Sequence, residues 1–492
     1  MQNEFLRQRL DAIERVIARG PYTDSWESLS WYRVPEWYMN LKFGIFIHWG
    51  VYSVPAFANE WYSRNMYCPG TPEFEHHVKT WGPHAKFGYK DFIPLFKAEK
   101  FSPEAWADLF AQAGARYVIP VAEHHDGFQM YRSELSHWNA CEMGPHRDVV
   151  GELSAACRAR GLQSGASTHR IEHFWFQGKG RTFDSDIKDP QYGDLYWPSV
   201  TEPEDFNMNA LDQLVPTEEY LQDWMLRTCE LIDRCQPAML YFDWWIQQKA
   251  ARPYLAKIAA YYYNRAAERG TQAVINYKHD AFPFGCAVPD VERGQFAELK
   301  PYFWQTNTAI AYNSWCWTEG NAFKPAEDLV RDLIDVVSKN GTFLLNVGPK
   351  PDGTISDEDT AVLTAIGDWM RVGGEAIYDT RPWKIFGEGP TKIKEGHFSD
   401  GERKGFTHED VRYTRRGDCL YATFLAPSPD GVYRAPALAA HPDGHGVFHG
   451  LVLNAERLDG KPCTWTRGED GLTIRTERSE GVMPVSFRVT IS

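Results

Sequence analysis

Short apolar runs, each followed by polar or aromatic residues, recur through the first 350 residues of this 492-residue chain. Such runs are typical of buried strands, and amphipathic helical patterns lie between them. Strands that alternate with helices pair in parallel, and a span of this length suits a (β/α)8-like TIM barrel. Eight complete units are not visible, so barrel closure is an inference. The clear runs are Phe43–Trp49, Arg116–Ala122, Leu162–Thr168, Ala238–Asp243, Ala273–Tyr277 and Thr342–Val347.

The segments between these runs carry helix start and stop signals. Ser102-Pro103-Glu104 predicts a helix start with an N-cap and proline in the first turn, and Gly114 predicts its end. Further helices are expected to begin at Thr217 and at Pro325. The first 20 residues form a charged amphipathic pattern without a continuous apolar stretch.

Past Tyr378 the helical period disappears and Gly-rich turns become frequent. Cys419–Leu425 and Val485–Ile491 alternate apolar and polar residues, which is the pattern of half-buried strands. We therefore expect a helical extension over 1–30, a barrel catalytic domain over 31–380 and a small β-sandwich domain over 381–492.

Composition narrows the class of partner. The net charge of -14 disfavours nucleic acid, whose binding needs neutralisation of phosphates. No apolar run is long enough to cross a membrane, and no signal peptide is visible. Nine cysteines without a C-x-x-C pair indicate reduced thiols. We expect a cytoplasmic protein, unless a leader has been removed, and a homo-oligomer is compatible with the sequence. The 19 Trp and 24 Tyr admit a carbohydrate ligand, because aromatic faces stack on sugars.

The predicted strands end in groups that suit catalysis. In a barrel the active site lies at the C-terminal strand ends, where the sequence places His48, Glu123 to Asp126, His169, Asp243 and Lys278. Asp243 lies between an apolar run and two Trp, which favours a partly desolvated nucleophile, although a strand-capping Asp is the alternative. A glycosidase also needs a second carboxyl group. Spacing does not choose among Asp290, Glu292, Glu298 and Glu319.

Three histidines have three interpretations. His48, His124 and His125 could recognise hydroxyls as neutral imidazoles, could be structural, or could bind a metal with a carboxylate. Adjacent residues of an extended strand point in opposite directions, which makes a shared metal awkward for His124 and His125. No phosphate-binding loop and no Ser or Cys nucleophile motif is present. We therefore expect no cofactor and no metal.

Four segments together resemble the α-L-fucosidases of glycoside hydrolase family 29. They are KFGIFIHWGVYSVPAFANEWY at 42–62, EHHDGF at 123–128, YFDWW at 241–245 and LLNVGPKPDGTI at 344–355. The resemblance implies an exo-acting, retaining enzyme that acts on fucosylated oligosaccharides or glycoconjugates, with Asp243 as nucleophile. It implies Glu292, in VPDVERG, as acid/base, with Glu319 as second choice. The substrate-binding residues that we infer are His48, Glu60, Trp61, His124, His125, His169, Trp245 and Lys278.

The chain also departs from the family pattern. Glu123 stands where many members have Lys, and Lys278 lies near a position where Arg is common. We expect a change in the wall of the pocket that follows the third predicted strand, which we call the third wall, because it carries His169, Arg170 and His173. A related α-L-glycosidase, such as an α-L-galactosidase, is therefore an alternative, since apolar pockets reject an added hydroxyl by only ~100-fold. A catalytically weakened carbohydrate-binding homologue and a metal-dependent hydrolase are further alternatives.

Overall fold

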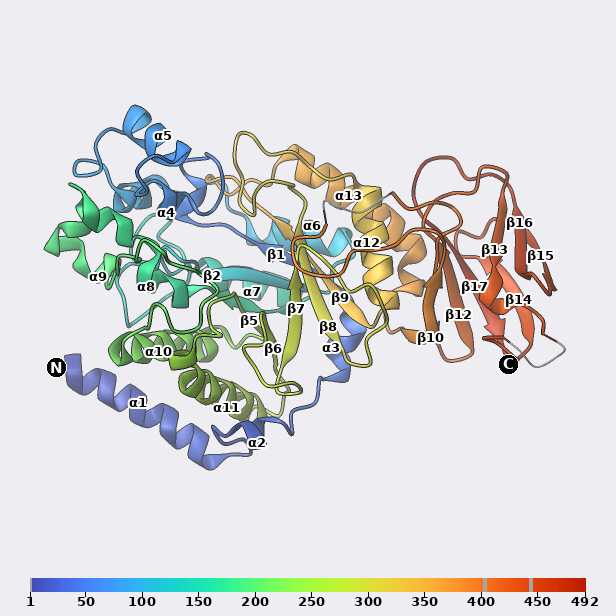
Figure 1. Ribbon diagram of the computed structural model, residues 1–492, viewed down its shortest axis with the longest axis horizontal. Helices are drawn as coiled ribbons and strands as arrows, with labels where there is room; N and C mark the ends of the chain where they lie inside the picture. The colour runs from blue at the N-terminus through green and yellow to red at the C-terminus, as the bar shows by residue number, and fades with distance from the viewer. Residues whose placement is uncertain (1, 401–404, 442–445) are drawn as a thin grey trace.

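Eight parallel strand positions close into a barrel in the computed structural model, which describes residues 2–400, 405–441 and 446–492 (Figure 1). β1 pairs with β9 on one side and with β2 on the other, so the predicted closure is confirmed. The barrel strands are β1 (Phe43–Ile47), β2 (Tyr117–Glu123), β3 (Gln163–Ser164) with β4 (Ala166–Thr168), β5 (Met239–Phe242), β6 (Val274–Tyr277), β7 (Val288–Glu292), β8 (Trp304–Ala309) and β9 (Gly341–Val347).

Two of these strands, β7 and β8, were absent from the sequence prediction. In β8, Gln305 and Asn307 bind the carboxylate of Asp290 inside the barrel, at 2.8 and 2.5 Å. The hydroxyl of Thr306 donates to the carbonyl oxygen of Val291 at 2.8 Å. Because polar side chains fill the barrel here, β8 has no apolar run. The expected crossover helices are also missing: residues 278–287 and 293–303, all described, join β6, β7 and β8 as loops.

Helices surround the rest of the barrel. The long ones are α6 (Pro103–Gln112), α7 (Val149–Ala159), α10 (Glu218–Cys235), α11 (Arg252–Glu268), α12 (Ala326–Ser338) and α13 (Asp357–Gly373). The predicted caps are confirmed: Ser102 accepts from the amide of Ala105 and Thr217 from that of Tyr220, both at 3.3 Å. The shorter helices are α2 (Trp26–Leu29), α3 (Glu36–Leu41), α4 (Tyr62–Asn65), α5 (Pro72–Thr80), α8 (His173–Phe176) and α9 (Gly193–Tyr196).

The N-terminal amphipathic pattern folds as α1 (Gln2–Arg19), which packs on α10 and α11 (Figure 1). Ile13 and Ile17 form its buried stripe, as the helical period requires. Among the described residues, no helix combines the length and the apolar character that crossing a membrane requires.

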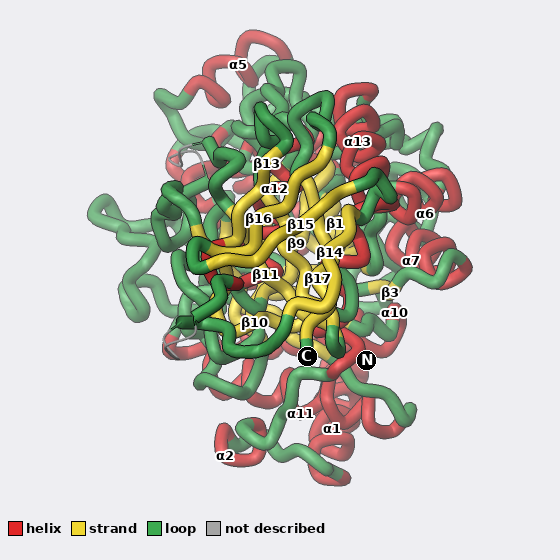
Figure 2. Tube along the Cα trace, turned by 90° about the vertical axis from the view of Figure 1, so that its right-hand side faces the viewer, coloured by secondary structure: helices red, strands yellow, loops and turns green. Residues whose placement is uncertain are grey.

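Two antiparallel sheets follow the barrel and lie in front of it in Figure 2. The larger contains β10 (Arg381–Glu388), β11 (Val411–Arg416), β12 (Cys419–Phe424), β17 (Val485–Ile491) and β14 (Val452–Arg457), in that order. The smaller contains β13 (Val432–Ala435), β16 (Gly471–Thr476) and β15 (Cys463–Gly468). Tyr433 of the small sheet packs against Phe424 and Phe487 of the large one, with ring centroids 4.9 and 5.1 Å away. The predicted β-sandwich is thus confirmed.

After β10, residues 389–400 return to the barrel and lie beside β7, where the helical layer is missing (Figure 1). Gly396 forms a β-bridge with Gln295. The amide of Glu292 donates to Nδ1 of His397 at 3.0 Å, and the amide of Phe398 donates to the carbonyl of Glu292 at 2.8 Å. A segment of the sandwich half therefore holds the end of a barrel strand.

A buried charge cluster also joins the two parts. Asp335 of α12 accepts from Lys339 of the same helix at 2.6 Å and from Arg412 of β11 at 2.5 Å. All three side chains are buried. Burial alone would raise the pKa of Asp335, but the two cations lower it below its usual value. Asp335 is therefore ionised and pairs with both buried cations.

Replacing Asp335 by Ala should leave both cations buried and unpaired. Loss of one partner from such a cluster costs about 3–5 kcal/mol, and we expect the free energy of unfolding in urea to fall by that amount. Asp328→Ala is the matched control on α12, because Asp328 pairs with Arg331 at the surface. Exposed pairs contribute about 0.2–1 kcal/mol. Equal losses in both variants would contradict the role of the cluster.

Candidate active site

A cavity of about 560 Å³ lies at the C-terminal ends of the barrel strands. Six of the strands end in, or just before, a titratable group that lines it: β1, β2, β4, β5, β6 and β7. Glu60 and Trp61, from the loop before α4, line it as well. The structure thus brings together nine of the ten predicted site residues: His48, Glu60, Trp61, His124, His125, His169, Asp243, Lys278 and Glu292.

One ammonium group joins the two proposed catalytic carboxylates. Nζ of Lys278 lies 2.6 Å from Oδ1 of Asp243 and 2.6 Å from Oε2 of Glu292. Those two oxygens are therefore no more than about 5.2 Å apart. Burial lowers the pKa of Lys278, but the two carboxylates raise it well above its usual value. Lys278 is consequently a permanent cation in this site.

The second oxygen of Asp243 faces imidazoles. Nδ1 of His169 lies 2.9 Å from Oδ2 of Asp243, and Nε2 of His125 lies 3.6 Å from it. Burial alone would raise the pKa of Asp243, but Lys278 and His169 outweigh burial and hold the pKa well below its usual value. Asp243 is therefore an anion at neutral pH, as a nucleophile must be.

The other histidines are neutral hydrogen-bonding groups. Burial lowers the pKa of His48 and His124 well below the usual value, and that of His125 to about 3. Nδ1 of His48 lies 2.7 Å from the amide oxygen of Asn346, and Nδ1 of His125 lies 3.1 Å from the carbonyl of His169. These oxygens accept, so we assign the ring proton to Nδ1 in both residues. Neutral imidazoles of this kind can accept hydrogen bonds from sugar hydroxyls.

His124 and His125 both line the cavity, which corrects our expectation that they point in opposite directions. Their ring centroids are only 4.1 Å apart. β2 ends at Glu123, so the two histidines lie in the following turn and the alternation of a strand no longer applies.

Two other expectations need correction. Trp245 does not line the cavity: it is fully buried and packs against Phe174 and Trp175. Its neighbour Trp244 lines the cavity instead, and the backbone at Trp245 is in the left-handed region, with a φ of 70°. Glu319, the second choice for acid/base, is exposed and does not line the cavity.

Glu60 is held by the loop after β8. Its Oε2 accepts from the amide of Trp315 at 2.9 Å and lies 3.3 Å from the hydroxyl of Ser314. Burial raises the pKa of Glu60 above its usual value, and the hydrogen bond from the Trp315 amide offsets only part of this rise. Trp61 lies nearly parallel to Trp244, with ring centroids 6.4 Å apart. Aromatic faces and a carboxylate therefore share this wall of the cavity.

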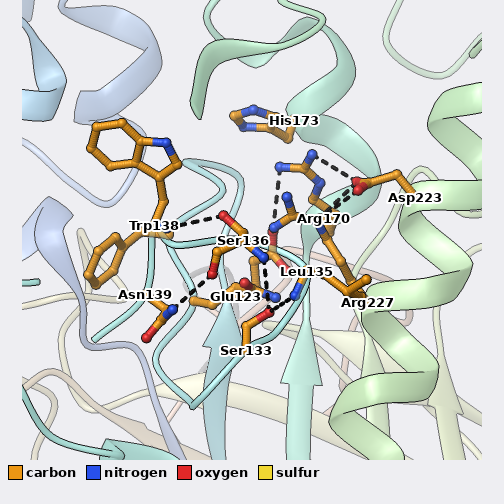
Figure 3. A network of polar contacts seen from close by, with 12 residues as sticks. Glu123, Ser133, Leu135, Ser136, Trp138, Asn139, Arg170, His173, Asp223 and Arg227 are labelled. Carbon is orange, nitrogen blue, oxygen red and sulfur yellow. Dashed lines mark hydrogen bonds and ion pairs between the residues drawn. The ribbon is translucent and has the colours of Figure 1, made fainter. Parts of the chain in front are cut away.

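Of the three residues expected to change the third wall, only His169 lines the cavity. Arg170 and His173 are buried behind it. Nη1 of Arg170 lies 3.5 Å from Glu123, and Nη2 lies 3.0 Å from Asp223. Arg227 binds the same two acids, at 3.2 and 3.0 Å, and Figure 3 shows both guanidinium groups between them. Glu123 thus belongs to a buried network of two acids and two arginines, which explains an acid at this position.

Some residues of the site had no assigned role in the sequence analysis. Glu172 is a fully buried carboxyl group 3.3 Å from Nδ1 of His125, and burial raises its pKa well above the usual value. In the sequence, only its position four residues after the end of the third predicted strand indicated that Glu172 could lie near the site. His397 and Phe398 line the cavity from the segment after β10, and no sequence pattern indicated this.

Two triplets of side chains are close enough to hold a metal ion. They are His48, His124 and His169, and His125, His169 and Asp243, with ligand atoms within 4.8 Å of one another. A metal at the second triplet would lie beside the Lys278 ammonium, which already neutralises Asp243. Like charges at this distance in a buried site repel strongly. At this second triplet, the donor set fits hydroxyl recognition better than a divalent cation.

A closed (β/α) barrel with two carboxylates at its mouth is an arrangement that glycoside hydrolases use, and the comparisons show that class for this chain. The family model described as Alpha-L-fucosidase matches residues 10–375, and the chain belongs to that family. Plasma alpha-L-fucosidase of Rattus norvegicus is 30% identical over 97% of this chain and 95% of its own. Tissue alpha-L-fucosidase of Homo sapiens is 29% identical over 86% and 82%. The crystal structure of Thermotoga maritima alpha-fucosidase has a TM-score of 0.73 and 29% identity, covering 95% of this chain and 100% of that one.

Removing the ammonium of Lys278 should change how activity depends on pH. In Lys278→Met, burial dominates Asp243, so its pKa rises and it stays ionised only at higher pH. We expect the acid limb of kcat/KM for an aryl α-L-fucoside to move up by about 1 unit or more. Lys278→Arg, which keeps the charge, should retain the limb near its original pH. An unmoved acid limb in Lys278→Met would exclude this role.

Proposed function

We propose that this protein is an exo-acting, retaining α-L-fucosidase that releases terminal fucose from fucosylated oligosaccharides. The separation of its two carboxylates carries the proposal. Retaining glycosidases hold the two groups about 5–5.5 Å apart, whereas inverting enzymes need about 6.5–9.5 Å to admit a water. Through their shared contact with Lys278, Oδ1 of Asp243 and Oε2 of Glu292 are at most about 5.2 Å apart, which supports the retaining geometry.

In the first step Asp243 attacks the anomeric carbon and forms a glycosyl ester, while Glu292 gives its proton to the departing oxygen. In the second step Glu292 takes a proton from water, which attacks the anomeric carbon and releases Asp243. Lys278 contacts both groups throughout. When Asp243 loses its charge to the ester, Glu292 has just become an anion, so the net charge around Lys278 stays the same.

The inner part of the cavity suits a single terminal sugar. His48, His124 and His125 offer neutral ring nitrogens, Glu60 offers a carboxylate, and Phe46 and Trp315 contribute apolar surface. A sugar with several hydroxyls and one methyl group matches such a mixture, because a buried polar group left without a partner costs about 1–3 kcal/mol. Fucose combines these features, and the family membership supports it.

The stereochemistry of the first product tests the mechanism directly. If Asp243 is a nucleophile, two inversions at the anomeric carbon give overall retention. Proton NMR recorded immediately after mixing enzyme with an aryl α-L-fucoside should show α-L-fucose before mutarotation. Early appearance of the β-anomer would assign an inverting mechanism and different roles to both acids.

Glu292→Ala tests the assignment of the acid/base. Nitrophenolate leaves without needing a proton, so the first step should persist with a nitrophenyl fucoside. A fucosyl-sugar linkage, whose leaving group needs a proton, should hardly be cleaved. Azide attacks without a base, so it should restore turnover and yield fucosyl azide. Glu319→Ala is the matched control, because Glu319 is exposed and away from the cavity. Azide rescue in Glu319→Ala and none in Glu292→Ala would reverse the assignment.

A further inference from the structure

The wall of the cavity next to Glu292 is built by residues from outside the barrel. His397 and Phe398 line it, and both lie on the segment between β10 and β11. We propose that these two residues form a binding subsite for the leaving sugar, a pyranose that lays its apolar face on Phe398. This inference rests on the proposed function, and it assigns a binding place to the part of the substrate beyond fucose.

The position of Glu292 places the leaving group on this side. The acid must meet the glycosidic oxygen, so the sugar beyond that oxygen lies against the surface around Glu292. That surface includes the segment that binds the backbone of Glu292, through the 3.0 Å contact with Nδ1 of His397 and the 2.8 Å contact with the amide of Phe398. Fucose, held near Asp243 and the histidines, occupies the inner part.

Phe398 has the features of a binding residue. Its side chain is 60% exposed although it lines the cavity. Its φ of 53° lies in the left-handed region, where a bulky residue is rare and unfavourable. Such conformations persist at ligand-binding positions when the surroundings enforce them. Here the hydrogen bond to the Glu292 carbonyl helps to hold the ring at the cavity rim, and an apolar sugar face would cover it.

His397 adds a polar group to the same wall. A backbone amide can only donate, so Nδ1 of His397 accepts from Glu292 and the ring proton lies on Nε2. The ring stacks on His279, another cavity residue, with centroids 4.7 Å apart and planes 28° apart. Its N–H is a donor suited to a sugar hydroxyl.

The cavity also reaches the loop between α9 and α10. Met208 and Asn209 of this loop line it, and Met208 is partly exposed. Trp244, beside Asp243, adds an indole surface. Apolar faces combined with amide and imidazole donors are typical of a pyranose site, since sugars carry both hydroxyls and C–H faces. A hexose or N-acetylhexosamine has this chemistry.

The test compares two substrates with the same fucosyl group. Fluoride, the leaving group of α-L-fucosyl fluoride, has no ring to bind, whereas a fucosyl disaccharide has one. Phe398→Ala should lower the ratio of kcat/KM for disaccharide over fluoride by about 3- to 10-fold, the worth of one stacking contact. Phe398→Tyr should restore the ratio. Phe284→Ala is the matched control: Phe284 is 70% exposed but does not line the cavity, and its ratio should not change.

A second measurement tests whether an acceptor sugar binds to the same subsite. With fucosyl fluoride as donor, an acceptor sugar competes with water for the glycosyl-enzyme, and Phe398→Ala should lower the ratio of transfer to hydrolysis. Thermal unfolding identifies a variant that fails to fold, in which case Phe398→Leu, which keeps apolar volume but loses the ring face, replaces it. Unchanged ratios in these variants would overturn the subsite. Absence of wild-type hydrolysis of both substrates would instead overturn the proposed function.

Discussion

The site depends on one buried positive charge. Asp243 is an anion in a desolvated pocket, where burial would make a carboxylate take up a proton unless a cation lay beside it. Lys278 supplies that cation and also contacts Glu292. The barrel makes this possible because β5, β6 and β7 are consecutive neighbours, so Asp243, Lys278 and Glu292 end three adjacent strands. Parallel pairing brings these ends to one edge of the sheet.

Around this centre, the polar groups bind one another in layers. The imidazoles of His48 and His125 are uncharged and fixed by oxygens of Asn346 and of the backbone. Behind them, the acids Glu123 and Asp223 face Arg170 and Arg227 (Figure 3). A buried acid without partners would be costly, which is why Glu123 occurs together with two arginines.

Sequence reasoning found the elements whose pattern is local. The buried runs gave six of the eight barrel strand positions, the caps gave α6, α10 and α12, and the strand ends gave Asp243, Lys278 and the histidines. It failed where tertiary contacts decide. β8 is polar because it packs against Asp290 inside the barrel. Trp245 packs against Phe174 and Trp175 and not on the cavity. His397 and Phe398 lie about a hundred residues beyond Glu292, so no local pattern could connect them.

That separation also bears on synthesis at the ribosome. The chain emerges from its N-terminus, so β7 is complete long before residues 396–398 leave the exit tunnel. The amide and carbonyl of Glu292 obtain their partners 105 residues and more later. Asp243 and Lys278 are therefore synthesised well before the residues that bind the backbone of Glu292. The order of translation thus leaves the end of β7 without these two hydrogen bonds until the sandwich half has begun to appear.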